Sequence, residues 1–288
     1  VPKEAPAGWY EGNLTIESYN ISPIIVPVRL RVYDFSLPDS THVKTAYKVW
    51  LDDYWHKLVT TDQQRMVWDL YMENFRRHRV SPPNPHNYAP ITWVLSGEEF
   101  ILNTTNFDAA MTRYLDEFGF NGFNVLDAPA SLGGYWRYYS TDYNRLLVKL
   151  LRKVMGHLRE RGWDRKAYVW WYDEPNPGVY SRLATEMGVV QQGAPDLRRL
   201  TTYQPDPPIY GSIDIWVPFL HNYRWALSAE RQRRGLGEEI WWYVACWPAY
   251  PYPNNYIDHP SINHRVRIWM AERHEVVGDL YWSTVWYK

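Results

Sequence analysis

Residues 167–175 have the sequence AYVWWYDEP, in which six apolar or aromatic residues lead directly into two acids and a proline. The first six have the composition of a buried β-strand, which the Asp-Glu-Pro ends abruptly. Successive strand side chains point to opposite sides, so Asp173 and Glu174 can face one pocket only if the chain turns there. Pro175 is suited to forcing that turn. The stretch predicts a strand whose carboxyl end carries two carboxylates.

Similar short strand-like runs recur along the chain and alternate with longer amphipathic segments of helical period. Such alternation within one domain predicts an α/β fold, specifically a (β/α)₈ TIM-type barrel. The expected strands are 44–47, 79–82, 121–127, 167–173, 199–203, 212–218, 239–246 and 278–284. The expected helices are 61–78, 107–118, 142–161, 179–192, 222–234 and 261–275.

The first forty residues follow a different pattern. Residues 9–16 and 24–33 are rich in apolar and β-branched residues, and 17–20 supply turn chemistry, so a β-hairpin is expected. An isolated hairpin is marginal in water. We therefore expect residues 1–40 to be the C-terminal hairpin of a β-sandwich domain with its linker, and residues 41–288 to be the catalytic barrel.

Composition removes several classes of partner. With 31 Lys and Arg against 32 Asp and Glu, there is no strong field to attract nucleic acid or an acidic membrane surface. No stretch approaches the roughly 18 apolar residues of a membrane helix. Cys246 is the only cysteine, so an intrachain disulfide is impossible. The 17 Trp and 24 Tyr side chains suit both wall packing and stacking on sugar rings.

Motifs for metals and cofactors are missing from the sequence. The nine histidines include no pair at helical spacing with the glutamate of a zinc hydrolase. There is also no serine-hydrolase elbow, no phosphate-binding glycine-rich loop and no dinucleotide fingerprint. We therefore expect neither a metal nor a cofactor.

The adjacent acids have two interpretations. They can be a solvated strand end that caps the helix beginning near Gly178, or catalytic groups at the carboxyl end of a barrel strand. The apolar surface of the preceding Trp170, Trp171 and Tyr172 favours catalysis, because it stabilises the protonated carboxyl that a general acid requires.

Glycoside hydrolysis needs a proton donor and a second group that attacks the sugar or activates water. The seventh expected strand ends in Ala-Cys-Trp-Pro without an acid, Asp214 lies inside the sixth, and Asp258 lies in a loop. Asp127, after the third strand, is the best distant carboxylate. The missing acid favours a nucleophile from the substrate itself, a 2-acetamido group. Glu174 would then be the acid, and Asp173 would stabilise the acetamido N–H.

Aromatic and amide side chains near strand ends are candidate sugar contacts, although each taken singly is more often a packing residue. A tyrosine hydroxyl beside the acetamido carbonyl would orient it, and Tyr203 or Tyr243 could supply that hydroxyl. The expected substrate-binding set is Asp127, Tyr203, Trp216, Trp242, Trp247, Tyr250, Asn254 and Trp282.

Several tracts resemble glycoside hydrolase family 123 and its broad, largely uncharacterised relatives. The resemblance runs over most of residues 28–288 and implies a β-sandwich before the barrel. It also implies a retaining β-N-acetylgalactosaminidase that uses the acetamido-assisted route, with Asp173 and Glu174 as the adjacent acids. The tracts are 170–175, 241–244, 250–254 and 279–283, together with 27–38, which is similar to the end of the sandwich.

The expected partner is therefore a glycan or glycoconjugate, and a secreted or periplasmic location is favoured. The oligomeric state stays open. Two alternatives remain: a glycosidase for a sugar without an acetamido group, with Asp127 or Asp258 as second carboxylate, and a barrel that binds glycans without cleaving them.

Overall fold

The computed structural model describes residues 1–38, 40–51, 56–58, 60–138, 140–223 and 227–285. The chain divides into two compact units, Val1–Thr41 and His42–Lys288. Residue 39 of the expected linker and residues 224–226 of the expected helix 222–234 lie outside the described residues.

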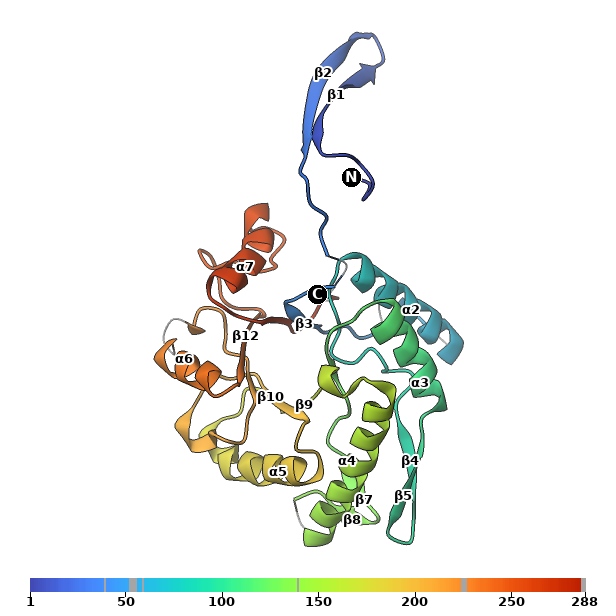
Figure 1. The fold of residues 1–288 in the computed structure, drawn as a ribbon, viewed down its shortest axis with the longest axis vertical. Coiled ribbons are helices and arrows are strands. Elements are labelled where there is room, and N and C mark those ends of the chain that lie inside the picture. Colours follow the sequence, from blue (N-terminus) through green and yellow to red (C-terminus); the bar gives the residue numbers. More distant parts are fainter. Residues whose placement is uncertain (39, 52–55, 59, 139, 224–226, 286–288) are drawn as a thin grey trace. The chain divides into compact units, whose positions relative to one another are not determined.

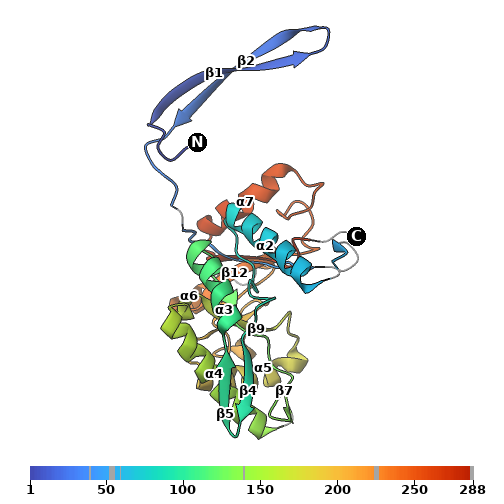
Figure 2. The same cartoon turned by 90° about the vertical axis from the view of Figure 1, so that its right-hand side faces the viewer.

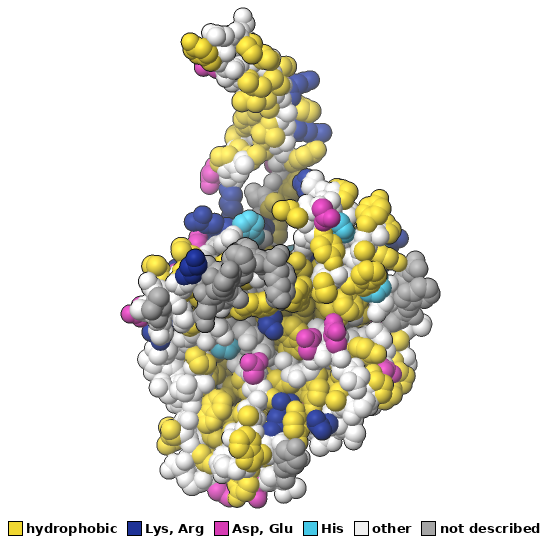
Figure 3. Space-filling view, turned by 180° about the vertical axis from the view of Figure 1, so that it is seen from behind, with side chains coloured by type: hydrophobic (Ala, Val, Ile, Leu, Met, Phe, Trp, Pro, Cys, Tyr) yellow, Lys and Arg dark blue, Asp and Glu magenta, His cyan; other side chains and the backbone are white. Residues whose placement is uncertain are grey.

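The first unit contains an antiparallel hairpin of β1 (Gly8–Ser18) and β2 (Ile21–Val32), joined through Asn20 at a φ of 64°. The register gives it two unlike faces. Leu14 and Ile16 lie opposite Val26 and Ile24 on an apolar face, whereas the other face carries Glu11 paired with Arg29. The apolar side chains are exposed (Figure 3). Such a face suits the inner side of a β-sandwich, which stays a prediction.

The second unit is an α/β fold around a nearly closed sheet of seven parallel strands, as in a TIM-type barrel (Figure 1). The sheet order is β3-β13-β12-β11-β10-β9-β6. These strands are β3 (Lys44–Tyr47), β6 (Phe123–Asn124), β9 (Ala167–Tyr172), β10 (Arg198–Thr201), β11 (Ile215–Trp216), β12 (Glu239–Val244) and β13 (Gly278–Tyr281).

The predicted second strand, 79–82, is wrong: no strand is formed there in the described chain. The segment nevertheless occupies the gap between β3 and β6, because Tyr47 N donates to Ser81 O at 3.0 Å and Asn124 N donates to Pro83 O at 2.7 Å. Pro82 and Pro83 lack the N–H donors that a regular ladder needs. The extended segment thus fills the place of an eighth strand without pairing as one.

Helices surround the barrel and agree with the expected segments. They are α2 (Thr61–Arg77), α3 (Thr105–Met111) continued by a π-helix (Thr112–Glu117), α4 (Thr141–Arg161), α5 (Tyr180–Gly193), α6 (Leu227–Gly235) and α7 (Ser261–Arg273). Single 3₁₀ turns lie at Asp164–Lys166, Pro177–Val179 and Pro207–Ile209.

Two small hairpins decorate the barrel, and neither was expected from the sequence. They are β4 (Thr92–Ser96) with β5 (Glu99–Asn103), and β7 (Ser131–Leu132) with β8 (Tyr135–Trp136). The β4–β5 hairpin, whose β5 contacts α4 (Figure 2), lies in the long connection that follows the second strand position.

The barrel interior is a packed core with no room for a pore. Its buried side chains include Tyr168, Leu200, Trp241 and Leu280. A Cβ atom at Gly278 would lie 2.1 Å from the Trp241 ring, so only glycine fits beside that indole. Because the interior is filled, the strands themselves can offer a ligand site only at an end of the barrel.

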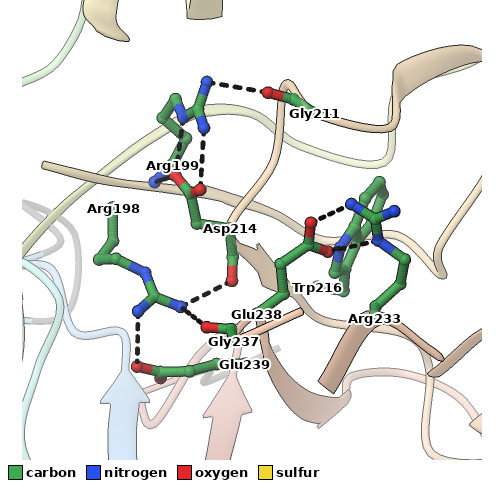
Figure 4. Close-up of polar contacts among 9 residues, drawn as sticks. All are labelled: Arg198, Arg199, Gly211, Asp214, Trp216, Arg233, Gly237, Glu238 and Glu239. Carbon is green, nitrogen blue, oxygen red and sulfur yellow. Dashed lines mark hydrogen bonds and ion pairs between the residues drawn. The ribbon is translucent and has the colours of Figure 1, made fainter. Parts of the chain in front are cut away.

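Ion pairs hold the amino ends of the strands together (Figure 4). Arg199 donates to both carboxylate oxygens of Asp214 at 2.7 and 2.8 Å, and neighbouring Arg198 donates to the Asp214 carbonyl at 2.9 Å. Arg198 also lies 3.6 Å from Glu239, which pairs with Lys44 at 2.7 Å. These contacts link β3, β10 and β12 on the face opposite the carboxyl ends.

A buried acid on α6 makes stability depend on pH. Glu230 is fully buried, and neither carboxylate oxygen has a hydrogen-bond partner within the described part of the chain. Burial raises the pKa of Glu230 to about 8. The folded state therefore binds a proton that the unfolded chain releases near its ordinary pKa of 4.5, so stability falls as pH rises through about 8.

We predict that Glu230→Gln is more stable than wild type at pH 9 by a few kcal/mol, on the order of the pKa shift, and close to wild type at pH 5. Urea unfolding at the two pH values measures this difference. Glu272→Gln, an exposed acid on α7, is the control and should change stability by less than about 0.5 kcal/mol at either pH. A Glu230→Gln effect that does not change with pH would contradict the prediction.

Candidate active site

An extra residue in β9 decides which side chains reach the barrel mouth. Trp170 lies opposite Leu200 of β10, but the next pair is Tyr172 with Thr201, so Trp171 is a bulge. Trp170 packs on the inner core, whereas Tyr172 packs in the outer one and donates to Glu186 at 2.5 Å. The bulge shifts the alternation by one and brings Asp173 to the mouth.

Thr202, the residue after β10, holds the two acids in place. Its buried hydroxyl donates to Asp173 Oδ1 at 2.5 Å and accepts from the Glu174 backbone N–H at 2.8 Å. Glu174 has a φ of 44°, in the left-handed region that costs a non-glycine residue conformational energy. This strained turn is what allows both adjacent carboxylates to line one pocket.

Tyr243 of β12 approaches Glu174 from across the barrel. Its side chain belongs to the inner core, its ring stacks on Phe219 with centroids 3.9 Å apart, and its hydroxyl donates to Glu174 Oε1. Burial and then the hydrogen bond to Glu174 raise the pKa of Tyr243 well above its ordinary value. The phenol therefore keeps its proton and acts as a fixed donor to one oxygen of Glu174.

A cleft with two lobes opens above these residues. The acid lobe, of about 430 Å³, contains Asp173, Glu174, Thr202 and Tyr243. The amide lobe, of about 320 Å³, contains three asparagines and Asp127. Lys48, Trp50, Trp170 and Asp173 line both lobes, so the two form one continuous cleft at the carboxyl ends of the strands.

The wall shared by the lobes combines a cation with an aromatic face. The Lys48 ammonium lies 5.5 Å from the centroid of the Trp170 ring. Trp50 and Trp282 have ring centroids 6.1 Å apart beside the acid lobe. A cleft with aromatic walls, amides and paired carboxylates suits a polar, ring-shaped ligand.

Four of the residues expected at the site line this cleft. Asp173, Glu174 and Trp282 belong to the acid lobe, and Asp127 belongs to the amide lobe, where it accepts from Asn124 at 3.0 Å. The structure thus brings the adjacent acids together with Asp127 around one cleft.

The other expected contacts lie elsewhere. Trp216 and Trp242 are fully buried in the outer core, because the alternation of β11 and β12 turns them toward the helices. Asn254 is buried and donates to the carbonyls of Ala245 and Pro248, so it shapes a loop. Tyr203 packs edge-on against a neighbouring tyrosine, and the exposed Trp247 and Tyr250 are not among the residues that line the two lobes.

Thr202 and Lys48 were not expected at the site, and Tyr243 was considered only as one of two tyrosines. The alternation that places Leu200 and Trp241 inside the barrel also predicts that Thr202 and Tyr243 point inward. That signal was present in the sequence once one residue of each strand was assigned to the interior.

The described residues contain no group of three or more His, Cys, Asp or Glu side chains that would hold a metal ion. Within the same residues, none of the helices combines the length and the apolar character needed to cross a membrane.

Comparison with known proteins identifies the fold. Residues 65–288 match the model of the catalytic domain of glycoside hydrolase 123. The structure of a family 123 glycoside hydrolase from Clostridium perfringens, described for glycolipid glycan hydrolysis, is similar with a TM-score of 0.66 and 16% identity. The match covers 98% of this chain but only 57% of that one.

Other solved structures are less similar. A β-glucuronidase from Parabacteroides merdae has a TM-score of 0.41 at 11% identity, over 96% of this chain and 36% of that one. An α-L-arabinofuranosidase from Thermotoga maritima has a TM-score of 0.42 at 13% identity, over 85% and 65%. No curated protein matches the sequence.

We predict that Thr202→Val lowers the free energy of unfolding by about 1–3 kcal/mol, because a buried hydroxyl that bridges Asp173 and the Glu174 N–H is lost. Urea unfolding measures the change. Thr185→Val is the matched control, since its exposed hydroxyl bonds only to a carbonyl of its own helix, and it should cost less than about 0.5 kcal/mol. Equal costs for the two variants would show that Thr202 does not hold the acids.

Proposed function

Because the chain belongs to glycoside hydrolase family 123, we propose that it is a retaining glycoside hydrolase that acts on a β-linked N-acetylgalactosamine or a similar 2-acetamido sugar. In this proposal the acetamido group of the substrate is the nucleophile. The observation that carries it is the pair of adjacent carboxylates, Asp173 and Glu174, in one lobe of the cleft with Thr202 and Tyr243 bound to them.

The first step breaks the glycosidic bond. Protonated Glu174 gives its proton to the glycosidic oxygen as the bond to C1 breaks, while the acetamido carbonyl oxygen bonds to C1 and forms an oxazolinium ion. Asp173 accepts the acetamido N–H and stabilises the positive charge of the ring. Tyr243 occupies Oε1 of Glu174, which leaves Oε2 to carry the proton.

The second step reverses the proton transfer. Glu174, now ionised, takes a proton from a water molecule that attacks C1 and opens the oxazolinium ring, so that the acetamide is restored. Two displacements at C1 retain the anomeric configuration. No side chain of the protein is needed as a nucleophile.

The distribution of acids supports this route. Among the described residues, the acidic side chains that line the cleft are Asp127, Asp173 and Glu174, and none follows β12. Asp214 is held by Arg199 at the opposite ends of the strands. Asp127 lines the other lobe with Asp173. The alternative of a glycosidase for a sugar without an acetamido group, with Asp127 as its second carboxylate, therefore stays open.

The natural substrate in this proposal is a glycan or glycoconjugate. The family 123 relative from Clostridium perfringens is described for hydrolysis of glycolipid glycans, which fits a terminal sugar carried on a larger molecule. The amide lobe beside the acid lobe supplies space and polar side chains for further sugar units.

The two acids are predicted to differ in their dependence on the leaving group. Glu174→Gln should lower kcat/KM by about 10²–10⁴-fold on the methyl β-N-acetylgalactosaminide, and much less on the p-nitrophenyl glycoside, because kcat/KM reports bond cleavage and this leaving group needs no proton. Asp173→Asn should lower kcat by about 10²–10³-fold on both substrates, because it acts on the acetamido group. Release of free sugar measures the rates.

Asp258→Asn, an exposed acid outside both lobes, is the matched control and should keep wild-type rates. If Glu174→Gln kept full activity on the methyl glycoside, the assignment of the general acid would fail.

The choice of nucleophile is tested with p-nitrophenyl β-N-acetylgalactosaminide, β-N-acetylglucosaminide and β-galactoside. We predict that wild type cleaves only the acetamido sugars, because a plain galactoside has no internal nucleophile. Cleavage of the galactoside that disappears in Asp127→Asn would establish the two-carboxylate alternative. Binding of the sugars without any cleavage would identify a glycan-binding barrel.

A further inference from the structure

A third cavity lies outside the cleft, between the beginnings of α4 and α5, with a volume of about 620 Å³. Its rim is made of small polar side chains that can donate or accept hydrogen bonds. They are Ser140, Thr141, Asn144, Ser181 and Thr185. The proposed hydrolysis uses none of these groups.

The lining of the cavity carries one cation that no described acid compensates. Among the described residues that line it, the acid is Glu186, which is 5% exposed and already bonded to Arg137 at 2.6 and 2.7 Å and to the Tyr172 hydroxyl. Arg182 is exposed, and the structure gives it no ion pair with any described acid. The guanidinium groups of Arg137 and Arg182 each lie 4.5 Å from the centroid of the Tyr138 ring. One cation therefore remains free to bind an anion.

The walls of the third cavity and of the cleft are linked by side-chain contacts. Trp171 lines the amide lobe, and the Arg137 guanidinium lies 5.7 Å from the centroid of its ring. Gly178, which lines the third cavity, follows Glu174 by four residues. Arg137 thus contacts the cleft wall through Trp171 and the wall of the third cavity through Glu186.

We propose that the third cavity is an accessory subsite for an acidic sugar, one that carries a carboxylate or a sulfate, on the same glycan whose terminal sugar the cleft binds. Arg182 pairs with the anionic group, since a guanidinium binds carboxylate and sulfate oxygens through parallel N–H donors. The rim hydroxyls and the Asn144 amide bind the sugar hydroxyls. The proposal rests on the proposed function in taking the ligand to be a glycan.

Calorimetric titration with 3′-sialyllactose, lactose 3′-sulfate and lactose tests the proposal on wild-type protein. None of the three carries a β-linked 2-acetamido sugar at its end, so binding is measured apart from hydrolysis and stands or falls separately from the glycosidase activity. We expect at least one acidic lactose to bind about tenfold more tightly than lactose. Its affinity should fall as the NaCl concentration is raised.

Two variants locate the anion. Arg182→Gln removes the cation from the rim, and Asn144→Asp adds an anion to the same rim. Each should weaken binding of the acidic lactose about tenfold. Arg231→Gln, an exposed arginine on α6, is the matched control and should leave it unchanged. Lys48→Gln tests the cleft as the competing cationic site.

Three outcomes would overturn the proposal: no preference for the acidic sugars, loss of the preference in Arg231→Gln as well, or loss in Lys48→Gln with Arg182→Gln unaffected. The last result would place the anion in the cleft. Binding of only one acidic lactose that depends on Arg182 supports the subsite and identifies its anion as carboxylate or sulfate.

Discussion

The extra residue in β9 is the constraint on which the rest of the site depends. Without the bulge at Trp171, strict alternation would turn Tyr172 into the barrel and Asp173 toward the helices. With it, Asp173 meets the hydroxyl of Thr202, and Tyr172 reaches Glu186 instead. One local irregularity therefore places Asp173 in the cleft and Tyr172 beside Glu186, which lines the third cavity.

The two ends of the barrel divide stability from chemistry. At the amino ends, acids such as Asp214 are fully paired with arginines, so they hold strands together and have no capacity left for a ligand. At the carboxyl ends, Asp173 and Glu174 are bonded to neutral hydroxyls of Thr202 and Tyr243. Neutral donors orient a carboxyl group without engaging it in an ion pair, which leaves it able to exchange a proton with a substrate or to face its positive charge.

Much of the fold follows from local patterns in the sequence. The period of apolar residues identified the helices and seven of the eight expected strands, because burial of one face requires that period. It failed at 79–82, where Pro82 and Pro83 cannot join a ladder, although the segment still fills the strand position. The pair at 173–174 was also visible, because two acids that end an apolar strand are a local feature. The family resemblance agreed with the match over 65–288.

By itself the sequence determined the alternating barrel and the place of the adjacent acids along the chain. Only the tertiary structure decided which neighbours those acids meet. The strand residues are all aromatic at positions 241–243, so their composition does not tell which of them points inward. Trp242 nevertheless packs outward, and Tyr243 reaches Glu174. The phase of a strand is set by pairing with strands distant in sequence, and a bulge shifts that phase without any change in composition.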